Sequence, residues 1–94
     1  MKEEESYLVT LYDYYKGLLT LKQRHYFEDY FFDNLSLSEI GENYSISRNA
    51  VSSQLLKIKE KLLEYENILN LYKKNEEIKK ILDSETFKKI EDLI

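Results

Sequence analysis

Residues 36–62 read SLSEIGENYSISRNAVSSQLLKIKEKL, and this stretch decides the fold of the chain. It contains two helix starts. Ser36 is followed three residues later by Glu39, which is a capping-box pattern, and Ser47 opens a second helix. The apolar residues after each start are spaced as on one helix face: Ile40 and Tyr44 in the first helix, then Val51, Leu55, Ile58 and Leu62 in the second. The pattern predicts two helices that bury one face against each other.

Gly41 falls where the two predicted helices should approach most closely. A residue without a side chain lets the two backbones come together at that point. The alternative is a tolerated surface glycine. Two helices joined by a tight turn form a helix-turn-helix, and this module directs the search for a partner toward nucleic acid.

The composition favours an all-α fold, with a C-terminal helical extension after the helix-turn-helix. The 94 residues include no proline and only two glycines, whereas Leu, Ile, Lys, Glu and Tyr dominate. A chain of this length predicts one domain over residues 1–94, with a core at about 4–69 and a helical tail at about 70–94. No cysteine is present, so the chain can form neither a disulfide framework nor a thiolate metal site.

The first residues, MKEEESY, are acidic, and no uninterrupted apolar run follows them. A secretory signal has a basic start and an apolar stretch, and a membrane span needs about 20 apolar residues. We therefore expect a cytoplasmic protein without a membrane span.

Two further helices should precede the helix-turn-helix. The first runs from about Glu4 to Leu18, and the second is capped by Thr20 with Gln23 and ended by Asp33-Asn34. The apolar positions are Leu8, Leu11, Tyr12, Tyr15, Leu18 and Leu19 in the first helix, and Phe27, Tyr30 and Phe31 in the second.

The helix that starts after Ser47 finds no breaker until Asn70 or Asn75. One or two short helices then close the chain, divided at Ser84, which is a suitable N-cap. From about Leu62 onward the amphipathic surface suits either a homodimer through the C-terminal helices or packing back over the first two helices. The apolar positions of the tail are Ile78, Ile81, Leu82, Phe87, Ile90, Leu93 and Ile94.

The nine tyrosines and four phenylalanines have two interpretations. Large rings at helical spacing fill the core of a small chain efficiently, and aromatic surfaces also stack on single-stranded bases. The spacing favours the core. Tyr7, Tyr14 and Tyr65 fit the stripes less well and suit an interface.

The charge balance opposes non-specific binding to a polyanion. Fourteen basic residues against 18 acidic ones give a net charge of −4 and a pI of about 5.0. Residues 36–61, with four basic and three acidic side chains, form the one segment with a positive balance.

The sequence does not predict an enzyme, a cofactor or a metal site. His25 is the only histidine, and its charged neighbours indicate a solvated helix face. Glu28 and Asp29 are adjacent, so on a helix they point about 100° apart and do not converge. No glycine-rich phosphate-binding loop is present.

From Leu19 to Leu62 the chain resembles the C-terminal promoter-reading region of bacterial sigma factors, through LTLKQR, LSLSEIG and the serine-opened helix with Val51 and Leu55. Over most of its length it resembles the YlxM family, through LYDYYKGLLTLKQRHYFEDYFFDNLSLSEIGENYSISRNAV and the acidic helical tail. The resemblance implies a bacterial DNA-binding protein of the winged-helix-like superfamily with a sigma region 4-like helix-turn-helix. It also implies a regulatory or accessory role beside the signal recognition particle GTPase.

The resemblance places Arg48, Asn49, Ser52 and Ser53 toward the major groove, with Gln54 and Lys57 further along. Asn49 can read adenine with a bidentate pair, and Arg48 can read guanine or hold a phosphate. The side chains suited to phosphates are Ser47, Ser53 and Lys57. The alternative for each is an exposed polar helix position.

The chain departs from the sigma pattern in ways that favour a protein partner. Ser52 and Gln54 stand where sigma relatives commonly carry cations, so phosphate partners are lost. Ser45 replaces the usual turn glycine, so it must be left-handed or reshape the turn. Leu56 lies on the otherwise polar side of the helix and shares its face with Leu63. One hypothesis is therefore a DNA-binding regulator that reads double-stranded DNA. The other is a protein-interaction module that contacts the signal recognition particle GTPase or its RNA, with little or no DNA binding.

Overall fold

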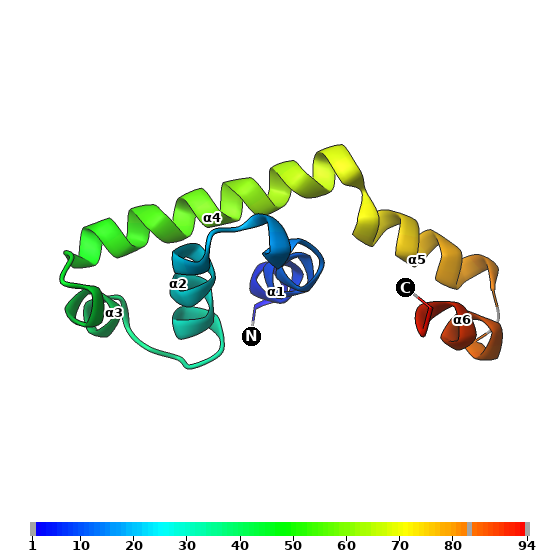
Figure 1. Ribbon diagram of the computed structural model, residues 1–94, viewed down its shortest axis with the longest axis horizontal. Helices are drawn as coiled ribbons and strands as arrows, with labels where there is room; N and C mark the ends of the chain where they lie inside the picture. The colour runs from blue at the N-terminus through cyan, green and yellow to red at the C-terminus, as the bar shows by residue number, and fades with distance from the viewer. Residues whose placement is uncertain (1, 83, 94) are drawn as a thin grey trace.

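The protein is described by a computed structural model over residues 2–82 and 84–93. Over these residues the regular structure is helical, as predicted (Figure 1). The side chains of Ser84 and Phe87, together with Ile94, lie outside what is described. In chain order the elements are α1 (Glu3–Tyr15), the 3-10 helix η1 (Lys16–Leu18), α2 (Leu21–Phe31), α3 (Leu37–Tyr44), α4 (Arg48–Leu69), α5 (Leu71–Ile81) and α6 (Ser84–Glu91).

The long helix α4 forms the spine of the molecule (Figure 1). Helices α1, α2 and α3 lie along one side of α4, and α5 and α6 continue beyond its far end, so the molecule measures 48 × 24 × 23 Å. The predicted stripe of α4 is confirmed for Val51, Ile58 and Leu62, which are fully buried, whereas Leu55 is partly buried beside them. The other buried apolar residues are Leu8, Leu11, Tyr12, Tyr15, Leu19, Tyr26, Phe27 and Ile40.

The end of the first helix differs from the prediction. The α-helix stops at Tyr15 and residues Lys16–Leu18 form a 3-10 turn, which has three residues per turn instead of 3.6. This change of phase rotates Leu18 off the buried stripe, and its side chain is 53% exposed. The extended backbone at Leu19 then directs that side chain into the core, where it is buried.

The signals around α2 are confirmed. The Thr20 hydroxyl accepts from the Gln23 N–H at 3.1 Å, and the Gln23 side-chain oxygen accepts from the Thr20 N–H at 2.9 Å. After α2, Asn34 adopts a left-handed conformation (φ 55°) that turns the chain toward α3. Local sequence therefore fixes both ends of this helix.

A hydrogen-bonded network holds the corner between α4 and α5. Of the two predicted breakers, Asn70 ends α4 with a left-handed backbone (φ 54°), and Asn75 lies within α5. The carboxylate of Glu66, which is 8% exposed, accepts from the Tyr72 and Lys73 N–H groups at 3.1 Å each and from the Tyr15 hydroxyl at 2.5 Å. The Tyr15 hydroxyl in turn accepts from the Leu71 N–H at 3.0 Å. Glu66 thus caps α5 and ties it to α1.

Helix α5 packs back within the chain, against α1, which is one of the two arrangements predicted for the tail. The Asn75 side-chain amide donates to the Tyr14 hydroxyl at 2.6 Å, and the Tyr72 ring meets the Tyr7 and Tyr14 rings edge-on. The Tyr65 hydroxyl donates to the Leu18 carbonyl at 3.4 Å. The three tyrosines predicted at an interface therefore make contacts within this chain.

The buried Tyr15 hydroxyl makes stability sensitive to alkaline pH. Burial, with the hydrogen bond to Glu66, raises the pKa of Tyr15 from 10 to about 12. Between these values the native state keeps a proton that the unfolded chain has lost, so the free energy of unfolding falls as pH rises. We expect Tyr15 to contribute a loss of about 2 kcal/mol by pH 12, measured by urea denaturation at pH 8, 10, 11 and 12.

Tyr15→Phe is the matched variant for this pH dependence. It should be less stable than the parent protein at pH 8, because Glu66 loses a partner, and it should lose less stability between pH 10 and pH 12. Equal slopes for the two proteins would contradict the assignment.

Candidate nucleic-acid interface

Helix α3 begins with the predicted capping box and ends in a strained turn. The Ser36 hydroxyl accepts from the Glu39 N–H, and the Glu39 carboxylate accepts from the Ser36 N–H, both at 3.1 Å. Ser45 takes the left-handed conformation (φ 56°), the first of its two predicted options. The Ile46 N–H donates back to the Gly41 carbonyl at 2.9 Å and closes the turn.

Gly41 permits the close approach that the sequence predicted. A Cβ atom at this position would lie 2.7 Å from the Ile46 carbonyl oxygen, which is backbone and cannot swing away. Beside it, Ile40 of α3 and Val51 of α4 are fully buried. The angle between α3 and α4 therefore depends on a residue without a side chain.

Helix α2 supports α3 from the other side. The Tyr44 hydroxyl donates to the Asp29 carboxylate at 3.1 Å, and the Tyr44 ring packs edge-on against Tyr26. Burial, followed by the hydrogen bond to Asp29, raises the pKa of Tyr44. The helix-turn-helix thus rests on a third helix.

Helix α4 starts on a side-chain cap. The Ser47 hydroxyl accepts from the Ala50 N–H at 3.0 Å, as predicted. The cap holds the first turn, in which Arg48 and Asn49 are exposed. The positive end of the α4 dipole lies at the same place, so this turn favours negatively charged groups.

The structure brings some of the candidate DNA-reading residues onto one face of α4. At about 100° per residue, Asn49, Ser53 and Lys57 point away from the buried stripe, and all three are exposed. Arg48 and Ser52 are also exposed, but the same spacing places Ser52 to one side of this face and Arg48 at about 180° from Lys57. Gln54 lies toward the buried side and is partly buried. The face of α4 that can enter a DNA groove therefore carries fewer residues than the sequence-based candidate set.

Charge on this face changes sign along α4. After Lys57, the same side carries the exposed Glu60 and Glu64 and the partly buried Lys61, so the charge there is negative on balance. Lys59 is held by Glu4 of α1, and this hydrogen bond lowers the pKa of Glu4. A polyanion is accordingly favoured at the first three turns of α4 and disfavoured beyond them.

Leu56 lies at the edge of an apolar hollow beside the candidate DNA face. Its side chain is 55% exposed, and the hollow, of about 250 Å³, also includes Phe27 and Phe31 of α2 and Leu37 of α3. Leu63 is also exposed, two helical turns further along. The sequence placed the α2 rings in the core and did not predict that they open onto a hollow.

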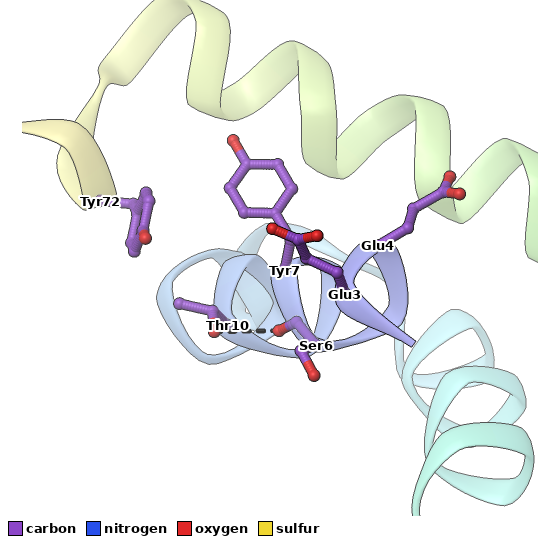
Figure 2. A pocket seen from close by; sticks show the side chains of 6 residues that line it. All are labelled: Glu3, Glu4, Ser6, Tyr7, Thr10 and Tyr72. Atoms are coloured by element: carbon purple, nitrogen blue, oxygen red, sulfur yellow. Dashed lines mark hydrogen bonds between the residues drawn. The ribbon is translucent and has the colours of Figure 1, made fainter. Parts of the chain in front are cut away.

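A second hollow, of about 590 Å³, lies between α1 and α5 and holds none of the candidate site residues. Figure 2 shows the rings of Tyr7 and Tyr72 beside each other at this hollow. Two carboxylates, Glu3 and Glu4, and the hydroxyls of Ser6 and Thr10 complete its lining. Its acidic and aromatic character does not suit a phosphate backbone.

The acidic residues of α2 are held apart, as predicted. Glu28 accepts from Tyr12, and Asp29 accepts from Tyr44. His25 is exposed on the surface of α2. Among the side chains that the structure describes, no group of three acidic or histidine residues is arranged to hold a metal ion. No helix within residues 2–82 and 84–93 is long and apolar enough to cross a membrane.

Known proteins match nearly the whole chain, including its helix-turn-helix. The family model described as "Putative helix-turn-helix protein, YlxM / p13 like" matches residues 2–93. A UPF0122 protein of Ureaplasma parvum serovar 3 is 44% identical over 96 aligned residues, which cover 98% of this chain and 97% of the relative. A UPF0122 protein of Bacillus licheniformis is 43% identical over 74 residues, covering 79% of this chain and 69% of the relative.

The close approach at Gly41 generates a stability prediction. We expect Gly41→Ala to lower the free energy of unfolding by about 1–3 kcal/mol, because the new Cβ must push the turn away from α3. This loss should outweigh the gain of about 1 kcal/mol that alanine brings to a helix. Urea denaturation followed by circular dichroism measures the change.

Gly17→Ala is the matched control, because a Cβ at Gly17 meets nothing within 4 Å. Its free energy of unfolding should stay within about 1 kcal/mol of the parent protein. If Gly41→Ala were no more destabilising than Gly17→Ala, the close approach would not constrain the fold.

Proposed function

Because this chain belongs to the UPF0122 family of YlxM/p13-like helix-turn-helix proteins, as its resemblance to YlxM predicted, we propose that it is a regulatory protein that binds double-stranded DNA. The observation that carries the proposal is the capped and exposed start of α4. Ser47 fixes the first turn, and Arg48 and Asn49 project from it into solvent. Side chains held on a rigid helix read base edges with little loss of conformational entropy.

Each candidate residue has a role that its chemistry supports. Asn49 pairs with the N6 and N7 atoms of adenine, and Arg48 pairs with guanine or with a phosphate. Lys57 holds a phosphate at the far end of the contact. The smaller polar residues assigned to positioning contacts are Ser47, Ser52, Ser53 and Gln54.

The charge on α4 sets the kind of complex to expect. With two exposed cations at the contact and carboxylates beyond Lys57, a single copy gains little from counterion release. Affinity must therefore come from base contacts and from a second copy on a second half-site. A regulator of this kind binds selectively and weakly, with a shallow dependence on salt.

Selection from random duplexes followed by affinity measurement tests the proposal. Asn49→Ala and Arg48→Ala should each weaken binding to the selected sequence by about 10- to 100-fold and relax the preference at one position. Lys57→Ala should weaken binding to all sequences alike and reduce the salt slope by about 1.

Lys74→Ala is the control for these variants, because Lys74 is exposed on α5. It should leave both affinity and salt slope unchanged. If no duplex is enriched, or if the α4 variants bind as the parent protein does, DNA binding through α4 is wrong.

A second function is favoured by the exposed Leu56 beside the apolar hollow. We propose as the alternative that Leu56 and Leu63 dock a protein partner, for which the YlxM resemblance implies the signal recognition particle GTPase. The net charge of −4 fits this alternative better than it fits DNA. An exposed apolar pair bordered by polar side chains is typical of a protein contact.

A binding assay with the purified GTPase and its RNA tests the alternative. Leu56→Glu should abolish capture by placing a charge at the centre of the contact. Ile68→Glu, which changes an equally exposed apolar residue further along α4, should have no effect. No capture by the parent protein, or equal loss in both variants, would contradict the alternative.

A further inference from the structure

We propose that α5 and α6, here called the arm, are exchanged between two copies of this chain when α4 straightens through Asn70. The partner is a second copy, and the interface is the one that the arm already forms with α1 within the chain. The inference does not depend on DNA binding, although an exchanged dimer would supply the second recognition helix that the proposed function needs.

The hinge is a single residue. Helix α4 ends at Leu69 and α5 begins at Leu71, so Asn70 alone separates them. Its left-handed backbone is unfavourable for a residue with a side chain, and asparagine tolerates it better than most. If Asn70 took the ordinary helical conformation, α4 and α5 would form one continuous helix.

Backbone hydrogen bonding does not oppose this straightening. In the bent form, the Leu71 N–H donates to Tyr15, and the Tyr72 and Lys73 N–H groups donate to Glu66. In a continuous helix the same three groups would donate to carbonyl oxygens four residues earlier. Every backbone donor has a partner in both forms, whereas straightening takes two donors from the Glu66 carboxylate and one from the Tyr15 hydroxyl. Contacts between the two copies must offset this loss.

Those contacts can be made equally well by another copy. The arm meets α1 through the Tyr72 ring beside Tyr7 and Tyr14, and through the Asn75 amide on the Tyr14 hydroxyl (Figure 2 shows Tyr7 and Tyr72). In a straightened chain the arm no longer covers the α1 of the same copy and extends away from it. Two such chains satisfy each other with the same residue pairs, which is the usual low-cost route to an exchanged dimer.

The exchanged form would also cover apolar surface that the bent form leaves in water. Ile68 and Ile81 are 65% and 80% exposed, and Leu69 and Leu71 beside the hinge are exposed as well. In a continuous helix, Ile68 and Leu71 lie three positions apart and therefore on one side of the helix. A second straightened helix that packs on this side would cover both side chains.

Two substitutions of Asn70 bias the hinge in opposite directions. Asn70→Gly removes the strain of the left-handed backbone and weakens a continuous helix, whereas Asn70→Ala does the reverse. We expect the dimer dissociation constant of Asn70→Ala to be about 30-fold lower than that of Asn70→Gly. Sedimentation equilibrium measures both constants, and circular dichroism checks that both variants fold. Equal dissociation constants, or no dimer of Asn70→Ala, would overturn the proposal.

A second pair of variants separates exchange from simple side-by-side association. The chain has no cysteine, so Tyr7→Cys and Tyr72→Cys can be made in separate preparations of the Asn70→Ala protein. Mixed and treated with a short bismaleimide, they should yield a covalent dimer of one chain of each kind, because Tyr7 of one copy meets Tyr72 of the other. A dimer in sedimentation without this mixed cross-link would mean that the arms associate without exchange, and the proposal would be wrong.

Discussion

Burial of one stripe of α4 is the constraint on which the rest of the molecule depends. Val51, Ile58 and Leu62 are fully buried, and α1, α2 and α3 are all held on that side of the spine. A helix that is buried along one stripe must leave the opposite stripe in water. The exposed face with Asn49, Ser53 and Lys57 is therefore a consequence of the core.

The same helix has two ends with different chemistry. At its start, the Ser47 cap and the close approach at Gly41 fix the direction in which Arg48 and Asn49 project. At its end, Glu66 holds α5 by bonds that a longer helix would make for itself. The start of α4 is rigid, whereas its end can be hydrogen-bonded in either a bent or a straight form. We therefore place DNA recognition at the start of α4 and exchange of the arm at its end.

Features set by neighbouring residues could be predicted from the sequence. The caps at Thr20, Ser36 and Ser47 and the break at Asn70 each depend on side chains within three or four positions. The overall all-α arrangement followed from such signals together with the apolar spacing, and the close approach at Gly41 followed from the short turn between two paired helices.

Features that join distant parts of the chain could not be predicted. Tyr15 and Glu66 are 51 positions apart, and Lys59 and Glu4 are 55 apart, so no local pattern reveals either pair. The exposure of Leu18 was missed because a 3-10 turn changes the helical phase without a strong sequence signal. The hollow beside Leu56 depends on how three helices meet, and this again is decided by packing.

We propose that the exposed start of α4 is the surface that binds DNA. Backbone amide chemical shifts of isotope-labelled protein, recorded during titration with a selected duplex, test it most directly. We expect the largest changes at Ser47 to Lys57, with small changes in α2. Changes concentrated in α5 and α6, or around the hollow at Phe31 and Leu37, would contradict it.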